Sequence, residues 1–272
     1  MDDLSNIPLM ILCGGKGTRL RDVTEILPKP MVAIGEQPIV WHIMKSYAAF
    51  GVKRFILCLG YKREAFTDYF MNYHLRTSDA TIRLGHSPDI TFHSESEEAG
   101  WEVTLAGTGV ESMTGYRVCK AAKYLRDDDE NFFLTYGDGV SDVNIRKLYD
   151  THIKSGKMMT MTAVHPEARF GQLELDGSNV TGFAEKPPRG EGYINGGFMV
   201  LSRKFLQQYV TDDEKMFLEQ TPMGSAAADG NMGVYKHEGF WQCMDNQREY
   251  QMLNDMWNRK KAPWTKYWNK NR

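Results

Sequence analysis

The sequence predicts an α/β fold in which helices cover both faces of a mostly parallel β-sheet, followed by a small β-rich lobe and a C-terminal helix. The first observation is a series of short apolar runs, several of them ended by glycine, which are typical of buried strands. The second is that segments with apolar residues at helical spacing separate these runs. A chain that alternates strand and helix in this way favours a parallel sheet, because each helix carries the chain back across one face.

Four apolar runs predict buried strands, and these lie at residues 8–13, 55–59, 132–136 and 158–164. Apolar side chains at helical spacing predict helices at residues 38–51, around 66–73, at 113–125 and at 144–155. Short alternating segments between residues 81 and 108 predict further strands and turns. This order predicts a Rossmann-like core over about residues 8–165.

The C-terminal part of the sequence, about residues 166–272, has a different pattern. Asp176-Gly177 stands between short apolar segments and predicts a β-hairpin. One more strand is predicted at residues 193–201, and a C-terminal helix at about 247–260. Because neither a repeat nor a linker interrupts the chain, we expect a single domain over residues 1–272, in which the C-terminal part forms the β-rich lobe and the helix.

Composition argues against several classes of function. The 272 residues include 33 Lys plus Arg and 35 Asp plus Glu, a net charge of -2, whereas a general nucleic-acid binder needs a basic excess. The four cysteines are far apart and form no Cys-x-x-Cys pair, which argues against a disulfide framework or a zinc site. The polar N-terminus and the lack of an apolar run of about 20 residues predict no signal and no membrane span. We therefore expect a cytoplasmic protein.

A glycine-rich segment directly follows the first predicted strand, at residues 14–20 (GGKGTRL). Glycines let the backbone approach a ligand closely, and successive N–H groups in such a turn form a concavity for phosphate oxygens. Arg19 adds a planar donor that suits two phosphate oxygens at once. The segment matches neither the Gly-x-Gly-x-x-Gly fingerprint nor a Walker A loop. Taken alone, a tight turn with solvated basic residues explains it equally well.

Lys29 stands between Pro28 and Pro30, which fix the backbone on either side of it. An ammonium presented from such a stiff segment suits the oxygens of a reacting phosphate. A surface bend with an incidental lysine is the alternative. Glu185-Lys186-Pro187 offers a second lysine for a phosphate, or else an exposed ion pair that contributes little to stability.

Asp138 lies between two glycines at the carboxyl end of a predicted strand, the edge at which open α/β sheets bind ligands. Asp245 offers a second carboxylate far along the chain. One or two carboxylates, with phosphates and water, are how Mg²⁺ is commonly held. The structural alternatives are a turn-capping residue for Asp138 and a helix N-cap for Asp245. The seven histidines show no metal-ligand spacing, and no arrangement indicates covalent catalysis.

The order of these motifs resembles one known family. LCGGKGTRL, PKPM, YGDGV, EKP, INGGF and FWQCMD follow one another as in the sugar-1-phosphate nucleotidyltransferases. Further segments, among them WHIMKSYAAFG, VTLAGTG, SMTGYR and KAPWTKYW, resemble the cytidylyltransferase branch of that family. The resemblance extends from about residue 9 to 268, and the joint occurrence of the motifs is far more specific than any one of them.

The resemblance implies a role for individual residues. It assigns the nucleotide and its triphosphate to Leu12, Gly14, Gly15, Gly17, Thr18, Arg19, Lys29, Thr114, Gly115 and Arg117. It assigns the sugar phosphate to Glu185, Lys186, Asn195 and Gly196. It implies that Mg²⁺ is held by Asp138 and Asp245, and that Lys29, Arg19 and Asp138 are catalytic.

The reaction that the resemblance implies joins a sugar 1-phosphate, glucose 1-phosphate in this branch, to CTP and releases pyrophosphate. It also implies a homo-oligomer. The sequence departs from the family pattern at residues 21–24, at Asn246 in place of Thr, and at Cys13 in place of Ala. Another nucleoside triphosphate or phosphorylated acceptor therefore stays open, as does a catalytically silent nucleotide-binding relative. The presence of Lys29, Asp138 and Asp245 together favours the enzyme.

Overall fold

The centre of the protein is one seven-stranded sheet, with strand order β14-β10-β13-β8-β1-β4-β7. The computed structural model describes residues 3–17, 26–85, 89–166, 172–184 and 192–268. Strand β13 runs antiparallel to both of its neighbours, and the other pairs are parallel. The strands of this sheet are β1 (Leu9–Leu12), β4 (Arg54–Leu59), β7 (Glu102–Gly107), β8 (Asn131–Tyr136), β10 (Met159–Val164), β13 (Ile194–Ser202) and β14 (Met232–His237). The predicted mostly parallel sheet is confirmed.

Eight described helices surround this sheet: α2 (Ile39–Ala48), α3 (Arg63–Met71), α4 (Tyr73–Thr77), α5 (Thr114–Ala121), α6 (Ile145–Ser155), α7 (Arg203–Tyr209), α8 (Thr221–Ala228) and α9 (Gln247–Asn258). Short 3-10 turns are η1 (Leu4–Asn6), η3 (Lys29–Met31), η4 (Ala122–Tyr124) and η5 (Pro263–Thr265). The residues that cap helix α6 explain where it begins and ends. Asn144 caps its first turn by accepting from the backbone N–H of Lys147 at 2.9 Å, and Gly156 ends it at φ +62°.

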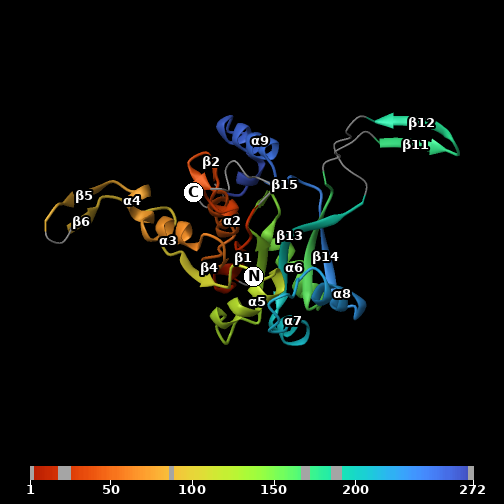
Figure 1. Ribbon diagram of the computed structural model, residues 1–272, viewed down its shortest axis with the longest axis horizontal. Helices are drawn as coiled ribbons and strands as arrows, with labels where there is room; N and C mark the ends of the chain where they lie inside the picture. Colours follow the sequence, from red (N-terminus) through yellow and green to blue (C-terminus); the bar gives the residue numbers. More distant parts are fainter. Residues whose placement is uncertain (1–2, 18–25, 86–88, 167–171, 185–191, 269–272) are drawn as a thin grey trace.

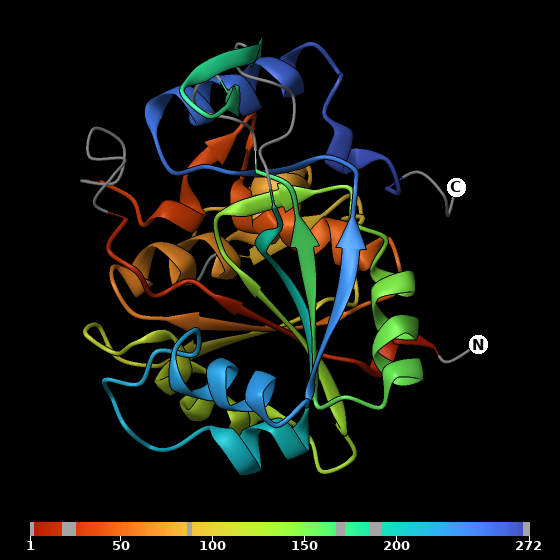
Figure 2. The same ribbon diagram turned by 90° about the vertical axis from the view of Figure 1, so that its right-hand side faces the viewer.

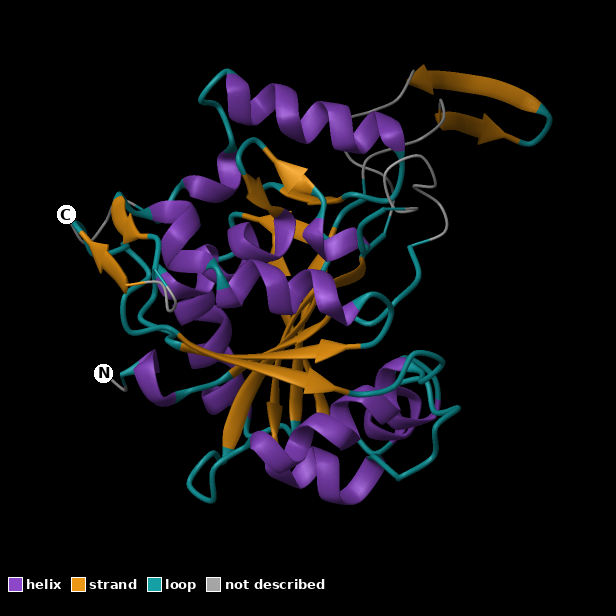
Figure 3. Cartoon of the chain, turned by 60° about the vertical axis from the view of Figure 1, so that its left-hand side comes forward, coloured by secondary structure: helices purple, strands orange, loops and turns teal. Residues whose placement is uncertain are grey.

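Helices lie on both faces of the sheet, as predicted (Figure 3). Strand β1 alternates between the two faces, because successive side chains of a strand point in opposite directions. Leu9 and Ile11 pack in the hydrophobic cluster that includes α2, α3, α6 and α9, whereas Met10 and Leu12 pack with α5, α7 and α8. Figure 2 shows α7 and α8 below the sheet and the C-terminal segment above it. Among the described residues, no helix is both long and apolar enough to cross a bilayer.

Four two-stranded sheets complete the described fold: β2 (Ala33–Ile34) with β3 (Gln37–Pro38), β5 (Ala80–Arg83) with β6 (Asp89–Phe92), β9 (Gly139–Ser141) with β15 (Trp241–Cys243), and β11 (Gln172–Asp176) with β12 (Asn179–Ala184). The β11–β12 pair is the hairpin predicted from Asp176-Gly177. This hairpin and the β5–β6 pair stand out from opposite sides of the body (Figure 1).

The structure also differs from the sequence prediction. The core does not end near residue 165, because β13 and β14 add strands to the central sheet from much later in the chain. The helix predicted at 113–125 is shorter, since α5 ends at Ala121 and tightens into η4. The helix predicted around 66–73 is divided at Asn72 into α3 and α4. Helices α7 and α8 and strand β14 were not predicted.

The C-terminal tryptophans close over α2. The ring of His42 lies in edge contact with Trp257 and Trp264, at centroid distances of 4.7 and 6.0 Å, and is fully buried. Its Nε2 lies 2.9 Å from the carbonyl oxygen of Ile34, and its Nδ1 accepts from the indole N–H of Trp264 at 3.2 Å. This pairing requires the neutral imidazole, because a second N–H on Nδ1 would face the indole N–H. These contacts give His42 a structural role in the core.

We predict that the free energy of unfolding falls as the pH is lowered from about 6.5 to about 4. Burial lowers the pKa of both His42 and His152 to about 4, whereas an unfolded histidine titrates near 6.5. Below about pH 6.5 the unfolded chain therefore binds protons that the folded chain does not, at a cost of up to about 1.4 kcal/mol per pH unit for each histidine. Urea unfolding across this pH range measures the slope.

The variant His42→Gln separates this contribution from that of the carboxylates. Its slope between pH 6.5 and 5 is expected to be shallower than that of the unmodified protein, because one depressed imidazole pKa has been removed. An unchanged slope would show that His42 does not stay neutral in the folded state.

Candidate active site

Lys29, Asp138 and Asp245 meet at one point, although they come from three distant parts of the chain. The ammonium of Lys29 lies 2.6 Å from Oδ2 of Asp138 and also forms an ion pair with Oδ1 of Asp245. The side chain of Lys29 is 11% exposed, and those of the two aspartates are 31% and 17% exposed. All three were predicted from the sequence, and the structure brings them together.

The two aspartates are placed by the short β9–β15 pair. Gly139 on β9 is the register partner of Cys243 on β15, and the backbone N–H of Met244 donates to the carbonyl oxygen of Asp138 at 2.8 Å. Asp138 directly precedes β9, and Asp245 follows β15 by two residues, so the pairing of these strands brings the two aspartates close together. The turn before β9 also needs Gly137, because a Cβ there would lie 2.9 Å from the carbonyl oxygen of Leu12.

Lys29 begins the 3-10 turn η3, which follows Pro28. The backbone N–H of Met31 donates to the carbonyl oxygen of Pro28 at 2.8 Å, so the segment is fixed locally, as the two prolines predicted. Burial by itself lowers the pKa of the Lys29 amine, but the charges and hydrogen bonds of Asp138 and Asp245 outweigh it. The pKa is therefore raised above its ordinary value, and Lys29 carries a positive charge at neutral pH.

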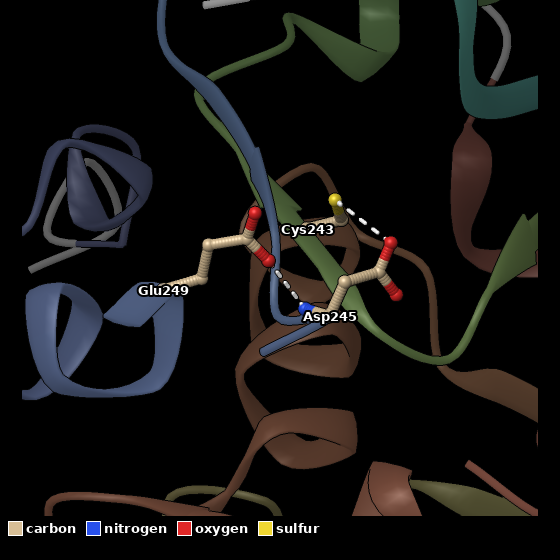
Figure 4. A group of neighbouring side chains, drawn as sticks. All are labelled: Cys243, Asp245 and Glu249. Carbon is tan, nitrogen blue, oxygen red and sulfur yellow. Dashed lines mark hydrogen bonds between the residues drawn. The ribbon is translucent and has the colours of Figure 1, made fainter. Parts of the chain in front are cut away.

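Glu249 and Cys243 both contact Asp245, and neither was predicted as a site residue from the sequence (Figure 4). Glu249 accepts the backbone N–H of Asp245 at 2.6 Å, and Asn246 accepts that of Glu249 at 3.0 Å. Asn246 is thus the N-cap of α9, the place proposed for Asp245 as a structural alternative. Asn followed three residues later by Glu is a capping pattern, and this signal could have identified Glu249. Asn246 fills a position at which Thr would serve similarly.

Oxygen atoms make this cluster suitable for a hard divalent cation. The side-chain ligand atoms of Cys243, Asp245 and Glu249 all lie within 4.8 Å of one another. The thiol of Cys243 lies 3.7 Å from Oδ2 of Asp245, and burial, together with the charges of Asp245, Glu249 and Asp138, raises its pKa to about 12. A thiol that keeps its proton is a poor metal ligand. The carboxylates of Asp138 and Asp245 are better metal ligands than this thiol, and their oxygen atoms suit Mg²⁺.

Arg117 lies beneath the glycine-rich loop and joins it to a second loop. Its guanidinium donates to the carbonyl oxygens of Gly14 at 3.1 Å, Gly109 at 2.6 Å and Val110 at 3.2 Å, and to Oγ1 of Thr108 at 3.0 Å. Burial lowers its pKa, but arginine remains charged in proteins. The geometry gives Arg117 a structural role beneath the loop; its predicted contact with a nucleotide stays a prediction.

The loop itself shows which of its glycines are required. A Cβ on Gly14 would lie 2.0 Å from Nη1 of Arg117, whereas a Cβ on Gly15 would meet no atom within 4 Å. Gly17 has φ +62°, a conformation that favours glycine. Lys16, between them, forms an exposed ion pair with Glu111 at 2.7 Å, and such a pair contributes little to stability and opens easily. Its ammonium is therefore available to other partners.

The remaining predicted residues divide into two groups. Thr114 and Gly115 begin α5, and Asn195 and Gly196 lie on β13. Thr18, Arg19, Glu185 and Lys186 lie outside the described residues. Two further residues, Tyr136 and Glu219, connect Thr114 to Asn195 through hydrogen bonds.

We predict that Gly14→Ala destabilises the protein by about 2 kcal/mol, because the new methyl group displaces the guanidinium of Arg117 from its buried acceptors. Gly15→Ala is the matched control and is expected to change the unfolding free energy by less than about 0.5 kcal/mol. Chemical denaturation of both variants measures the difference. Equal losses would contradict the role given to Arg117.

The chain also resembles known proteins over nearly its whole length. The chain matches the family described as nucleotidyl transferase over residues 9–243. It is 44% identical over 255 residues to a glucose-1-phosphate cytidylyltransferase of Salmonella typhi, an alignment that covers 94% of this chain and 97% of that protein. It is 39% identical over 259 residues to a protein of Bacillus subtilis (strain 168) named "Probable glucose-1-phosphate cytidylyltransferase", covering 95% and 99% of the two chains.

Solved structures share the fold at lower sequence identity. HddC from Yersinia pseudotuberculosis, complexed with GMP-PN, has a TM-score of 0.64 at 22% identity, covering 92% of this chain and 99% of that one. The inositol-1-phosphate CTP transferase from T. maritima has a TM-score of 0.58 at 18% identity, covering 92% and 95%. The family match and the near full-length identity lead to one conclusion: this chain belongs to the nucleotidyl transferase family.

Proposed function

We propose that the protein is a glucose-1-phosphate cytidylyltransferase that depends on Mg²⁺ and makes CDP-glucose and pyrophosphate from glucose 1-phosphate and CTP. The observation that carries this proposal is the 44% identity, over 94% of the chain, to a protein of that name. The meeting of Lys29, Asp138 and Asp245 supports it, because a lysine and two carboxylates at one point suit phosphoryl chemistry.

The proposed reaction needs no general base. A phosphate oxygen of the sugar 1-phosphate, already an anion, attacks the α-phosphorus of the triphosphate, and the bond from that phosphorus to the bridging oxygen breaks as pyrophosphate leaves. Both substrates are polyanions, so catalysis requires alignment and neutralisation of charge. Mg²⁺, when bound, supplies part of this neutralisation. Asp138 and Asp245 are the residues that would hold it.

Lys29 has a second part in this proposal. In the structure its ammonium lies between the two carboxylates. A divalent cation would compete with it for their oxygens, and the released ammonium would then be free to neutralise charge at the reacting phosphate. Pro28 and Pro30 restrict movement of the backbone when the side chain of Lys29 moves, so the ammonium stays near the aspartates.

We also propose that the protein is cytoplasmic and forms a homo-oligomer. All four cysteines are free, as expected in a reducing compartment. The β5–β6 pair projects from the body (Figure 1), and it carries exposed apolar side chains, among them Ile82, Ile90 and Phe92. Such side chains, together on a projecting hairpin, favour contact with another subunit.

We predict that pyrophosphate is released with glucose 1-phosphate and CTP in the presence of Mg²⁺, and much more slowly with UTP, dTTP, ATP or GTP. Testing the five triphosphates in parallel measures the choice of base. Activity with another triphosphate in place of CTP would support the proposed reaction but contradict the proposed choice of base. Binding of a nucleotide without pyrophosphate release, for every phosphorylated acceptor tried, would indicate the catalytically silent relative.

We predict that Asp245→Asn lowers kcat/KM by at least about 100-fold and raises the Mg²⁺ concentration needed for half-maximal activity, because one anionic ligand has been lost. Asp255→Asn makes the same chemical change at an exposed position on α9 and is expected to stay within about twofold of the unmodified enzyme. Steady-state kinetics over a Mg²⁺ titration measures both. A folded Asp245→Asn enzyme with an unchanged Mg²⁺ requirement would overturn this ligand assignment.

A further inference from the structure

Four side chains, one of which is Tyr136, two residues before Asp138, form a continuous chain of hydrogen bonds. The hydroxyl of Thr114 donates to Oε2 of Glu219 at 2.5 Å, and the hydroxyl of Tyr136 donates to Oε1 at 2.7 Å. The amide of Asn195 donates to the hydroxyl oxygen of Tyr136 at 3.1 Å. Glu219 is the only charged member of this chain and lies at its centre.

Glu219 reaches this place because the segment between α7 and α8 packs on the N-terminus of α5. The backbone N–H groups of Met113 and Gly115 each donate to this segment at 3.0 Å, to the carbonyl oxygens of Glu214 and Met216. A Cβ on Gly115 would lie 2.9 Å from the latter oxygen, so the contact requires glycine. The segment is thus fixed immediately before Glu219.

The positions of these four side chains in the fold relate them to the reacting groups. Tyr136 ends β8, two residues before Asp138, and Asn195 lies on β13. In the sheet β13 lies on one side of β8, and β1, with its glycine-rich loop, lies on the other. If the loop holds the triphosphate, then in-line attack requires the acceptor to approach from the side opposite the leaving pyrophosphate. Asn195 on β13 lies on the side of β8 away from β1 and its loop, and Tyr136, on β8, lies between the two.

The charge of Glu219 suits the hydroxyl groups of a sugar 1-phosphate and not its phosphate. A carboxylate accepts up to about four hydrogen bonds, twice the number that these two hydroxyls supply. Glu219 is exposed, so its oxygens are accessible to a ligand. A phosphate would be repelled by this charge, whereas a sugar hydroxyl is a donor and would be attracted. Tyr136 and Thr114 hold the carboxylate in one orientation, and such prior ordering favours specific binding.

We propose that Glu219 determines specificity for the sugar by accepting a hydrogen bond from a hydroxyl of the hexose of the sugar 1-phosphate. This inference rests on the proposed function, since it assumes that a sugar 1-phosphate is the acceptor. It adds a residue that neither the motifs nor the cluster at Lys29 indicates. Tyr136 and Thr114 are positioning residues in this arrangement, because they act through Glu219.

The test compares the enzyme with Glu219→Ala and Glu219→Gln on glucose 1-phosphate and on its analogues that each lack one hydroxyl. We expect Glu219→Ala to lower kcat/KM for glucose 1-phosphate by at least about tenfold while KM for CTP changes by less than about twofold. The unmodified enzyme should have a lower kcat/KM for at least one deoxy analogue than for glucose 1-phosphate. In Glu219→Ala this difference should disappear, while the differences for the other analogues should remain. Glu219→Gln retains an acceptor oxygen and should restore part of the activity.

Glu214→Gln is the matched control, because it removes a carboxylate from the same segment. It is expected to leave the discrimination among the analogues unchanged. Equal losses for every analogue would overturn the proposal in favour of a purely structural role for Glu219. A changed response to 2′-deoxy-CTP, with no change among the sugar analogues, would overturn it in favour of nucleotide recognition.

The outcome remains separate from that of the proposed function. Absence of pyrophosphate release by the unmodified enzyme would contradict the function itself. Release by the unmodified enzyme, with no selective effect of Glu219→Ala, would contradict only this inference. If Glu219→Ala does not fold, as judged by its melting transition, Glu219→Gln provides the same comparison with a side chain of equal size.

Discussion

The pairing of β9 with β15 is the constraint on which the candidate site depends. It is a short pairing, yet it joins residue 139 to residue 243 and so places two carboxylates of like charge at one point. Like charges at close range repel, and the ammonium of Lys29 offsets that repulsion in the structure. The geometry of the backbone therefore brings the aspartates together, and the positive charge of Lys29 offsets the repulsion between them. A cation-binding centre follows from these two conditions, because the same oxygens that hold an ammonium can hold a metal ion.

Much of the fold could be predicted because its N-terminal part obeys local rules. Strand β1, with its four buried residues and the glycines after it, and helix α2, which begins after Pro38, are determined by short stretches of sequence. Helix α5 was predicted too long because its apolar spacing continues into η4, where the turn tightens. Strand β14 was not predicted, since Met232–His237 is only partly buried at the edge of the sheet and lacks the continuous apolar pattern of a central strand.

The residues of the candidate site also fall into two groups, those that local sequence predicted and those whose contacts it did not. Lys29, Asp138 and Asp245 belong to motifs, and each was found from its neighbours in the sequence. Glu219 and Arg117 differ, because what they contact is set by tertiary packing. Arg117 belongs to a segment with a family resemblance, but its bonds to carbonyl oxygens of two loops become visible only in three dimensions. Glu219 lies in a connection with no distinctive pattern, and it reaches Thr114 only because α5 and the α7–α8 connection pack together.

The buried guanidinium of Arg117 has a consequence that extends beyond its contacts. Its hydrogen-bond partners described above are uncharged, so its positive charge is not cancelled by a carboxylate bonded directly to it. In a medium of low dielectric constant such a charge produces a potential that reaches farther than it would in water. The glycine-rich loop lies directly over this source. A polyanion diffusing toward the loop would be attracted before it makes any contact, and dissolved salt would weaken that attraction by screening. A residue that holds two loops together thereby also contributes a positive potential at the surface above it.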